Sequence, residues 1–266
     1  MHDMSAQVSS TTADDTTLPP DAAHSMARLD ASPRHGEWVM LHTANGDSLH
    51  AWIVYPERST RAPVVVVIHE IFGMSTWIRA VTDQLAKEGF IAIAPDLISG
   101  PRIPVGPDTL TNQQGIAAVS ALKPADVQAG IDAAAKYAMA LPAALHRYGV
   151  VGFCWGGTAS FAHAVHSPTL GASVVYYGTS PSAEDLARVK APVLGLYGGS
   201  DARVVATVAP ADSEMKAMHK TYDPHIFAGA GHGFLRAQSG NDGANMAATQ
   251  RAWPATIEWF RKYLGS

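Results

Sequence analysis

Strand-like and helix-like segments alternate regularly after Pro33, and this alternation constrains the fold more than any other feature of the sequence. Residues 63–69 are dominated by Val and Ile, which is typical of a strand buried on both faces of a parallel sheet. Residues 76–88 follow with apolar positions at helical spacing, and Gly89 ends them. The alternation continues over residues 90–94, 125–141, 148–153, 158–166, 172–177, 183–189, 192–197, 205–219, 222–228 and 244–264. The pattern predicts an α/β domain with a mostly parallel, doubly wound sheet of about eight strands and helices on both faces.

The chain is long enough for one substantial core, with 266 residues of which 47% are hydrophobic. We expect a single domain over residues 33–266, beginning with a hairpin whose strands, residues 37–42 and 48–55, flank Asn45 and Gly46. Residues 1–32 lack apolar periodicity and predict an irregular extension. Residues 99–123 form the least regular stretch of the rest, and we expect one wall of a pocket there rather than a large cap domain.

Charge, apolar runs and cysteine content exclude several kinds of protein. The 19 basic and 23 acidic residues are scattered, which disfavours a nucleic-acid partner. No apolar run reaches the length of a membrane span, and no glycine fingerprint for a nicotinamide cofactor follows the first parallel strand. We expect no cofactor and no metal site. The single cysteine cannot form an internal disulfide, and the start of the chain lacks a secretory pattern. A cytoplasmic protein and an exported protein whose signal was removed are therefore both open alternatives. The sequence also leaves open whether the protein is a monomer or a homodimer.

The strongest local motif surrounds this single cysteine. Cys154 stands between Gly152 and Gly156, directly after one expected strand and directly before one expected helix. A tight strand-to-helix turn of this kind holds a nucleophile in a strained backbone conformation, and it needs small residues two positions before and two positions after. The turn also places the sulfur at the positive end of the helix, where we expect a thiolate to be favoured. The alternative is a buried cysteine that packs as a small hydrophobe.

A thiol nucleophile needs a base and a group that orients the base, and in α/β-hydrolases these follow in the order nucleophile, acid, histidine. Asp201 comes after the strand expected at residues 192–197, and His232 comes after the strand expected at residues 222–228. Since all three follow strand ends, they are expected on one edge of the sheet. Individually, Asp201 could be a helix cap and His232 a surface residue of a glycine loop.

Acyl transfer also requires donors for the developing oxyanion. The backbone N–H groups of Trp155, after the nucleophile, and of Ile71, after the strand at residues 63–69, have the expected positions. Glu70 is unusual, because a carboxylate directly after a buried apolar strand is costly unless it has a partner or a catalytic task.

Four motifs together resemble the dienelactone hydrolase family: His69 to Gly73, Pro95 to Leu97, Gly152 to Gly157, and Gly231 to Phe234. The resemblance runs from about Gly36 to the C-terminus. It implies the α/β-hydrolase fold, a triad of Cys154, His232 and Asp201, and a Glu70 that helps deprotonate the thiol when substrate arrives. A structural, salt-bridged carboxylate is the alternative for Glu70.

The resemblance also bears on the substrate. Family members that open dienelactones hold the substrate carboxylate with two arginines. Arg236 matches one of them, whereas Gly100 occupies the other position, with Arg102 only nearby, and Gly233 stands where the family often has serine. The candidate substrate-binding residues are Arg236, Phe72, Arg102, Tyr177 and Phe234.

These observations predict a hydrolase that cleaves small carboxylic esters or lactones through an acyl-cysteine intermediate. Two alternatives remain open at this point. The same triad could act on another electrophile, such as a thioester, an amide or a phosphoester, or the fold could serve a non-hydrolytic binding or thiol protein.

Overall fold

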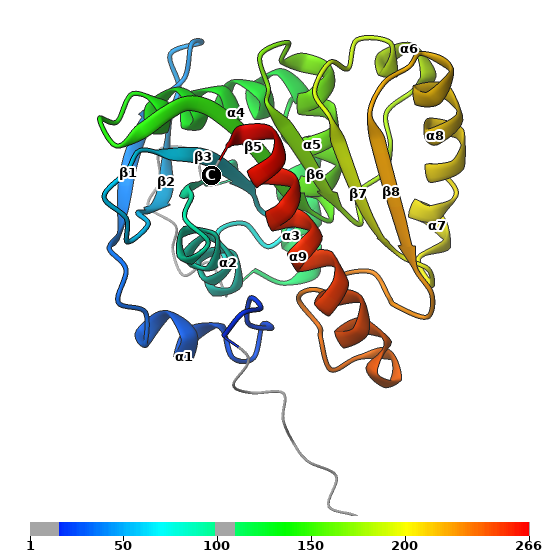
Figure 1. The fold of residues 1–266 in the computed structure, drawn as a ribbon, viewed down its shortest axis with the longest axis horizontal. Coiled ribbons are helices and arrows are strands. Elements are labelled where there is room, and N and C mark those ends of the chain that lie inside the picture. The colour runs from blue at the N-terminus through cyan, green and yellow to red at the C-terminus, as the bar shows by residue number, and fades with distance from the viewer. Residues whose placement is uncertain (1–15, 99–109, 266) are drawn as a thin grey trace, which may run out of the picture.

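An eight-stranded sheet forms the centre of the computed structural model, which describes residues 16–98 and 110–265. The strand order is β1-β2-β4-β3-β5-β6-β7-β8, and the strands from β4 to β8 in that order are parallel (Figure 1). The strands are β1 (Gly36–His42), β2 (Ser48–Val54), β3 (Ala62–Ile68), β4 (Ile91–Pro95), β5 (Ala144–Phe153), β6 (Ala172–Tyr176), β7 (Val193–Gly198) and β8 (Tyr222–Phe227). The mostly parallel sheet and its number of strands are confirmed, as is the antiparallel hairpin at its start.

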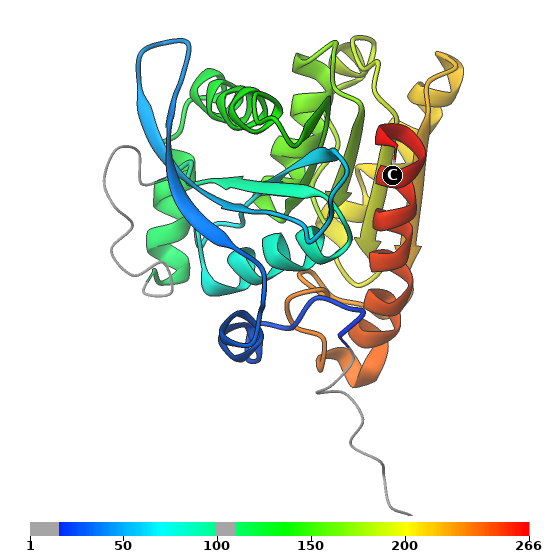
Figure 2. The ribbon, with the colours of Figure 1, turned by 60° about the vertical axis from the view of Figure 1, so that its left-hand side comes forward.

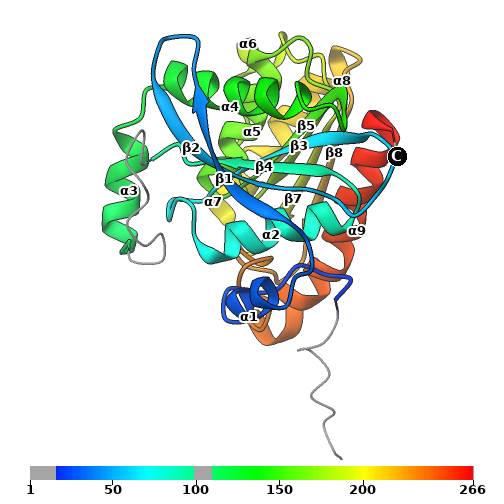
Figure 3. The same cartoon turned by 90° about the vertical axis from the view of Figure 1, so that its left-hand side faces the viewer.

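Helices cover both faces of this sheet. Their bounds are α1 (Ser25–Asp30), α2 (Thr76–Lys87), α3 (Asn112–Ser120), α4 (Pro124–Met139), α5 (Trp155–His166), α6 (Ala183–Leu186), α7 (Ala202–Val205), α8 (Val208–Ala217) and α9 (Ala244–Leu264), with a short 3₁₀ turn, η2 (Asn241–Gly243), before the last. In Figure 3, α4 lies on one side of the sheet and α2 on the other. None of the helices in the described parts of the chain is long and apolar enough to cross a membrane.

The central strand β3 shows why both faces are covered. Val64 and Val66 belong to the core under α4, α5 and α8, whereas Val65 and Val67 belong to the core under α2 and α9. Successive side chains of a strand point to opposite faces, so a continuous apolar run requires an apolar layer on each side. All seven residues of β3 are buried. The doubly wound arrangement therefore follows directly from this run.

Two expectations about helices were wrong. The stretch expected to be irregular at residues 99–123 contains α3, which begins with a capping box between Thr111 and Gln114. The single helix expected over residues 205–219 is two helices, α7 and α8, which are separated at Thr207. Pro210 lies in the first turn of α8, where its missing N–H is tolerated, but its ring would disrupt a helix that continued from the preceding turn.

The part of the N-terminal extension that the structure describes packs onto the domain, and it contains the helix α1 where the sequence predicted irregular structure. Helix α1 lies beside α2, and Figure 2 shows this segment close to the loop that precedes α9. Leu18, Pro19 and Pro20 are buried. The Trp77 indole donates a hydrogen bond to the Pro20 carbonyl at 3.0 Å, so the segment is held by a buried residue of α2.

Candidate active site

Cys154 lies between β5 and α5, in the strand–turn–helix context that the sequence predicts. Its backbone has φ 58° and ψ −117°, a conformation that is strained for a residue with a side chain. A Cβ on Gly152 would lie 1.9 Å from the Gly156 carbonyl oxygen, and a Cβ on Gly156 would lie 2.4 Å from the His69 carbonyl oxygen. The two flanking glycines are therefore required by close backbone approach, which makes the sharp turn at Cys154 possible.

The predicted acid and base meet after the ends of β7 and β8. His232 Nδ1 lies 2.5 Å from Asp201 Oδ2. The Asp201 side chain is only 9% exposed and that of His232 is 36% exposed, so the carboxylate is held inside while the imidazole reaches the surface. Asp201 is also the N-cap of α7 and accepts a hydrogen bond from the Val204 N–H. The helix cap and the contact with His232 thus fix the same carboxylate.

Tyr177 lies near Cys154, His232 and Glu70. Its ring centroid lies 5.2 Å from that of His232. Burial raises the pKa of Tyr177 well above its ordinary value, and the charges of Glu70 and Cys154 raise it further, which requires both groups to be nearby. The Cys154 N–H donates a hydrogen bond at 3.1 Å to the carbonyl of Tyr176, the residue before Tyr177. Tyr177 therefore connects the sharp turn at Cys154 to the loop that carries His232.

The Cys154 thiol is protonated at neutral pH in this structure. Burial raises its pKa from 9.0 to about 11, and the Glu70 charge adds to this effect. A hydrogen bond from the Trp155 backbone and the charge of Arg203 lower the pKa without reversing the shift. The backbone at the start of α5 thus favours the thiolate, as expected of a helix terminus, but desolvation has the larger effect. Among the described residues the sulfur makes no hydrogen bond to His232.

Glu70 forms an ion pair with Arg236 beside the thiol. Glu70 is 4% exposed, and its Oε2 lies 3.1 Å from Arg236 Nε. Burial raises the pKa of Glu70 from 4.5 to about 7, although the Arg236 charge acts in the opposite direction. Within the described residues, neither of these two atoms has a hydrogen bond of good geometry. The pKa of this carboxyl is thus close to neutral pH, and its Oε2 atom lacks a well-aligned hydrogen bond from a described residue.

His69, for which the sequence suggested no role, supports the loop that carries Glu70. Its Nδ1 lies 2.7 Å from the Glu70 carbonyl oxygen, and its Nε2 accepts a hydrogen bond from the Leu97 N–H at 3.1 Å. These partners require a neutral ring protonated at Nδ1, in agreement with burial that lowers its pKa. The ring stacks on Trp155 at 5.5 Å. The sequence signal that could have identified it is a polar residue at the end of the apolar run, directly before Glu70.

The two predicted oxyanion donors belong to neighbouring strand ends. Ile71 follows β3 and Trp155 follows β5, and these strands pair in parallel, with Ile68 opposite Gly152. Helix α3 approaches this region closely, because a Cβ on Gly115 would lie 2.3 Å from the Ile71 carbonyl oxygen. Part of the stretch expected to form a pocket wall therefore contacts the predicted oxyanion loop.

The candidate substrate-binding residues have different surroundings. The Arg236 guanidinium lies 4.7 Å from the centroid of the Phe72 ring. Tyr177 and Phe234 are both buried, with ring centroids 5.4 Å apart, so these two rings support the His232 loop from inside. Arg102 lies outside the described residues.

The N-terminal segment holds the loop that carries His232 and Arg236. The Ala22 N–H donates to the Arg236 carbonyl at 3.0 Å. The Gln238 side chain, which is buried, donates to the Pro19 carbonyl at 2.9 Å. No sequence signal predicted these contacts, because they join residues more than 200 positions apart.

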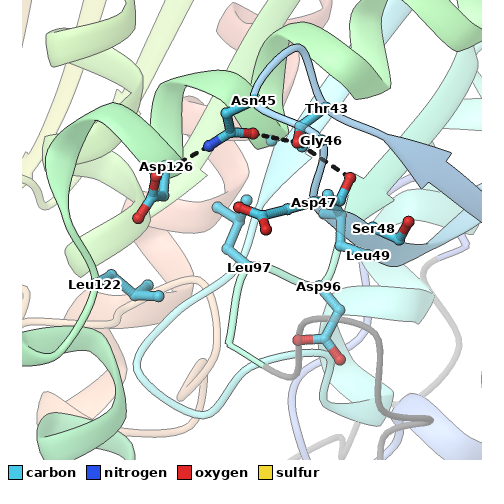
Figure 4. Close-up of a pocket in the computed structure, with 11 residues that line it drawn as sticks. Thr43, Asn45, Gly46, Asp47, Ser48, Leu49, Asp96, Leu97, Leu122 and Asp126 are labelled. Carbon is cyan, nitrogen blue, oxygen red and sulfur yellow. Dashed lines mark hydrogen bonds between the residues drawn. The ribbon is translucent and has the colours of Figure 1, made fainter.

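A cavity of about 410 Å³ lies elsewhere, between the β1–β2 hairpin tip and α4 (Figure 4). Asp47, Asp96 and Asp126 line it, and Asn45 donates a hydrogen bond to Asp126 at 3.1 Å. Cys154, Asp201 and His232 are not among its lining residues. In the described ranges, no three His, Cys, Asp or Glu side chains are grouped so that they could hold a metal ion.

Comparison with known proteins identifies the family of this chain. The sequence model of the dienelactone hydrolase family matches residues 49–264. A Methylorubrum extorquens protein assigned as a carboxymethylenebutenolidase is 33% identical, over 92% of this chain and 87% of its own length. The carboxymethylenebutenolidase of Pseudomonas putida is 29% identical, over 80% of this chain and 91% of its own length.

Solved structures give the same result. A crystal structure assigned as a dienelactone hydrolase from Klebsiella pneumoniae superimposes with a TM-score of 0.74 at 28% identity, and it covers 86% of this chain and all of the other. The sheet of this protein is therefore that of the α/β-hydrolase fold, and the chain is a hydrolase that belongs to the dienelactone hydrolase family.

Proposed function

We propose that this chain hydrolyses small carboxylic esters or lactones through an acyl-cysteine intermediate on Cys154. The observation that carries the proposal is the pairing of His232 with Asp201. Both residues follow strand ends on the same edge of the sheet as the sharp turn at Cys154. A nucleophile, a positioned base and a carboxylate that orients the base are the three parts that covalent acyl transfer requires. The family membership supports this class of reaction.

The first step needs a proton acceptor for the thiol. With a pKa of about 11, Cys154 is almost entirely protonated at neutral pH, whereas Glu70, with a pKa of about 7, can accept a proton there. In our proposal a substrate that draws Arg236 away frees Glu70 to take the thiol proton. This role corresponds to the one that the family resemblance implies for Glu70.

The thiolate then attacks the substrate carbonyl carbon and forms a carbon–sulfur bond. The N–H groups of Trp155 and Ile71 stabilise the resulting oxyanion. Collapse breaks the carbon–oxygen bond to the leaving group, and the departing alcohol oxygen takes the Nε2 proton of His232. Because Glu70 holds the thiol proton, the proposal requires a His232 ring that enters the cycle with a proton on both nitrogens. Asp201 stabilises the protonated ring through Nδ1.

Hydrolysis of the acyl-enzyme uses the now neutral ring. His232 takes a proton from water, the water oxygen attacks the acyl carbon, and the carbon–sulfur bond breaks to release the acid product and the thiolate. The thiolate recovers its proton from Glu70, which restores the starting state. Cys154, Glu70 and His232 thereby return to their starting protonation states, and the net change is one water consumed and one ester bond cleaved.

Substitution of the nucleophile tests the proposal. Cys154→Ala is expected to abolish hydrolysis of p-nitrophenyl acetate. His166→Gln, at the exposed C-terminal end of the helix α5 that Cys154 precedes, should leave this hydrolysis unchanged. In His232→Gln, deacylation should stall, so that mass spectrometry finds an acetyl group on Cys154. Retention of most esterase activity in Cys154→Ala would refute the assignment.

A further inference from the structure

The Ile71 N–H, one of the two predicted oxyanion donors, makes no hydrogen bond to any residue that the structure describes. Ile71 lies in a turn after β3, outside any helix or strand. The Trp155 N–H, the other predicted donor, belongs to the first residue of α5, where helical N–H groups lack an acceptor within the helix. A donor in a turn stabilises an oxyanion effectively only if other contacts hold its direction, because the effect depends on preorganisation.

His69 and Gly73 fix the peptide group that carries the Ile71 donor. The Glu70 carbonyl and the Ile71 N–H belong to one planar peptide group, and in a trans peptide they point in opposite directions. The described residues contain no cis peptide bond. The Glu70 carbonyl oxygen lies 2.7 Å from His69 Nδ1 and accepts a hydrogen bond from the Gly73 N–H at 3.2 Å. These two contacts set the direction of the carbonyl and therefore that of the Ile71 N–H.

Leu97 determines which nitrogen of His69 carries the proton. The Leu97 N–H donates to Nε2 at 3.1 Å, so Nε2 presents a lone pair and Nδ1 of the neutral ring is the donor. The His69 side chain is completely buried, which favours the neutral ring. Leu97 follows β4, which pairs with β3 in the sheet. The ring thus joins two adjacent strand ends, and its only N–H is the one that holds the Glu70 carbonyl.

The same histidine contacts the segment that supplies the other donor. The His69 and Trp155 rings stack with their centroids 5.5 Å apart and 23° between their planes. The His69 backbone also lies against α5, because a Cβ on Gly156 would lie 2.4 Å from the His69 carbonyl oxygen. His69 therefore touches both the loop that carries Ile71 and the start of the helix that carries Trp155.

We propose that His69 is a positioning residue of the oxyanion site, whose Nδ1–H orients the Ile71 N–H through their shared contact with the Glu70 peptide group. His69 acts through the backbone and does not itself touch the substrate. The proposal rests on the proposed hydrolytic function, because it assigns how an oxyanion donor of that function is held. If the ring only filled space in the core, loss of activity would instead follow loss of stability.

Two amide substitutions separate the roles of the ring nitrogens. In His69→Asn, the amide N–H group lies near the position of Nδ1 and can donate to the Glu70 carbonyl. In His69→Gln, the longer side chain places its amide near the position of Nε2, where its oxygen can accept from the Leu97 N–H. Asn leaves the larger cavity, so a role limited to packing predicts the greater loss of activity in His69→Asn. The proposal predicts the reverse order.

We expect kcat for p-nitrophenyl acetate to fall about 10²-fold in His69→Gln, the lower range for loss of one oxyanion donor, with little change in KM. His69→Asn should retain most of the wild-type kcat, although its melting temperature is lower than that of His69→Gln. The matched control is His163→Gln, which removes another completely buried histidine, bound to Gln128 and Tyr148 toward the far end of α5. This control should lower the melting temperature and leave kcat unchanged.

A thiono ester gives a measurement that a folding defect does not change. Sulfur accepts hydrogen bonds weakly, so an oriented N–H contributes less to hydrolysis when sulfur replaces the carbonyl oxygen of p-nitrophenyl acetate. The ratio of kcat for the oxygen ester to kcat for the thiono ester should fall in His69→Gln and stay near the wild-type ratio in His69→Asn. Alkylation of Cys154 by iodoacetamide forms no oxyanion, so its rate should be the same in both variants and the wild type.

The outcomes separate this proposal from the proposed function. Equal kcat values for His69→Gln and His69→Asn, or an unchanged ester ratio in His69→Gln, overturn the positioning role. A decrease in the alkylation rate that matches the decrease in kcat also overturns it, because the defect then lies in the thiol. Hydrolysis of p-nitrophenyl acetate by Cys154→Ala would refute the proposed function, and the positioning role with it.

Discussion

Replacement of Glu70 by Gln should change how the stability of the protein depends on pH. In the folded state the pKa of Glu70 is raised from 4.5 to about 7, so between these values the folded protein holds a proton that the unfolded chain has lost. Stability is therefore fully retained below pH 4.5 and is lost as pH rises toward 7. Glutamine does not titrate, so Glu70→Gln lacks this loss.

The size of the effect follows from the two pKa values. Integration of the difference in bound protons gives a cost of about 0.8 kcal/mol at pH 5 and about 3.3 kcal/mol at pH 8. The free energy of unfolding of the wild type should thus fall by about 2.5 kcal/mol relative to Glu70→Gln between these conditions. Conversion to free energy is appropriate here because Glu70 is 4% exposed.

Urea denaturation at pH 5 and pH 8 measures this difference directly, with circular dichroism as the signal. Glu184→Gln is the matched control, because Glu184 is exposed and forms no ion pair with a described residue. The difference in free energy of unfolding between Glu184→Gln and the wild type should not change with pH. If Glu70→Gln and the wild type differ in free energy of unfolding by the same amount at both pH values, the inference that Glu70 is a buried carboxyl with a raised pKa is wrong.

Three further predictions follow from close contacts at the site. Gly152→Ala should lower the free energy of unfolding by about 1–3 kcal/mol in urea titrations, because its Cβ would lie 1.9 Å from the Gly156 carbonyl oxygen. Asp201→Asn should reduce kcat for p-nitrophenyl acetate by about 10⁴-fold with an unchanged melting temperature, since the amide supports the wrong tautomer of His232. Removal of residues 1–24 should lower the melting temperature more than removal of residues 1–15, because only the longer truncation removes the hydrogen bonds to Trp77, Arg236 and Gln238. Equal melting temperatures of the two truncated proteins would contradict this role.

Much of the fold could be predicted from local pattern. The Val-rich run of β3 and the glycines around Cys154 are constraints that act within a few residues, so they are visible in the sequence. Helix α3 was missed although Thr111 and Gln114 form a recognisable capping box, because the prolines and glycines before it dominated the interpretation. The break between α7 and α8 was missed because apolar spacing continues across it, and Pro210 was the available signal.

The sequence by itself determined which groups follow the strand ends, and therefore the candidates Cys154, Asp201, His232 and Glu70. Only the tertiary structure decided that Asp201 and His232 touch and that Arg236 is engaged by Glu70. It also decided that the thiol is protonated, because burial by surrounding elements outweighs the helix terminus. Desolvation and ion pairing depend on neighbours in space that lie far apart in the chain, so a local sequence pattern does not reveal them.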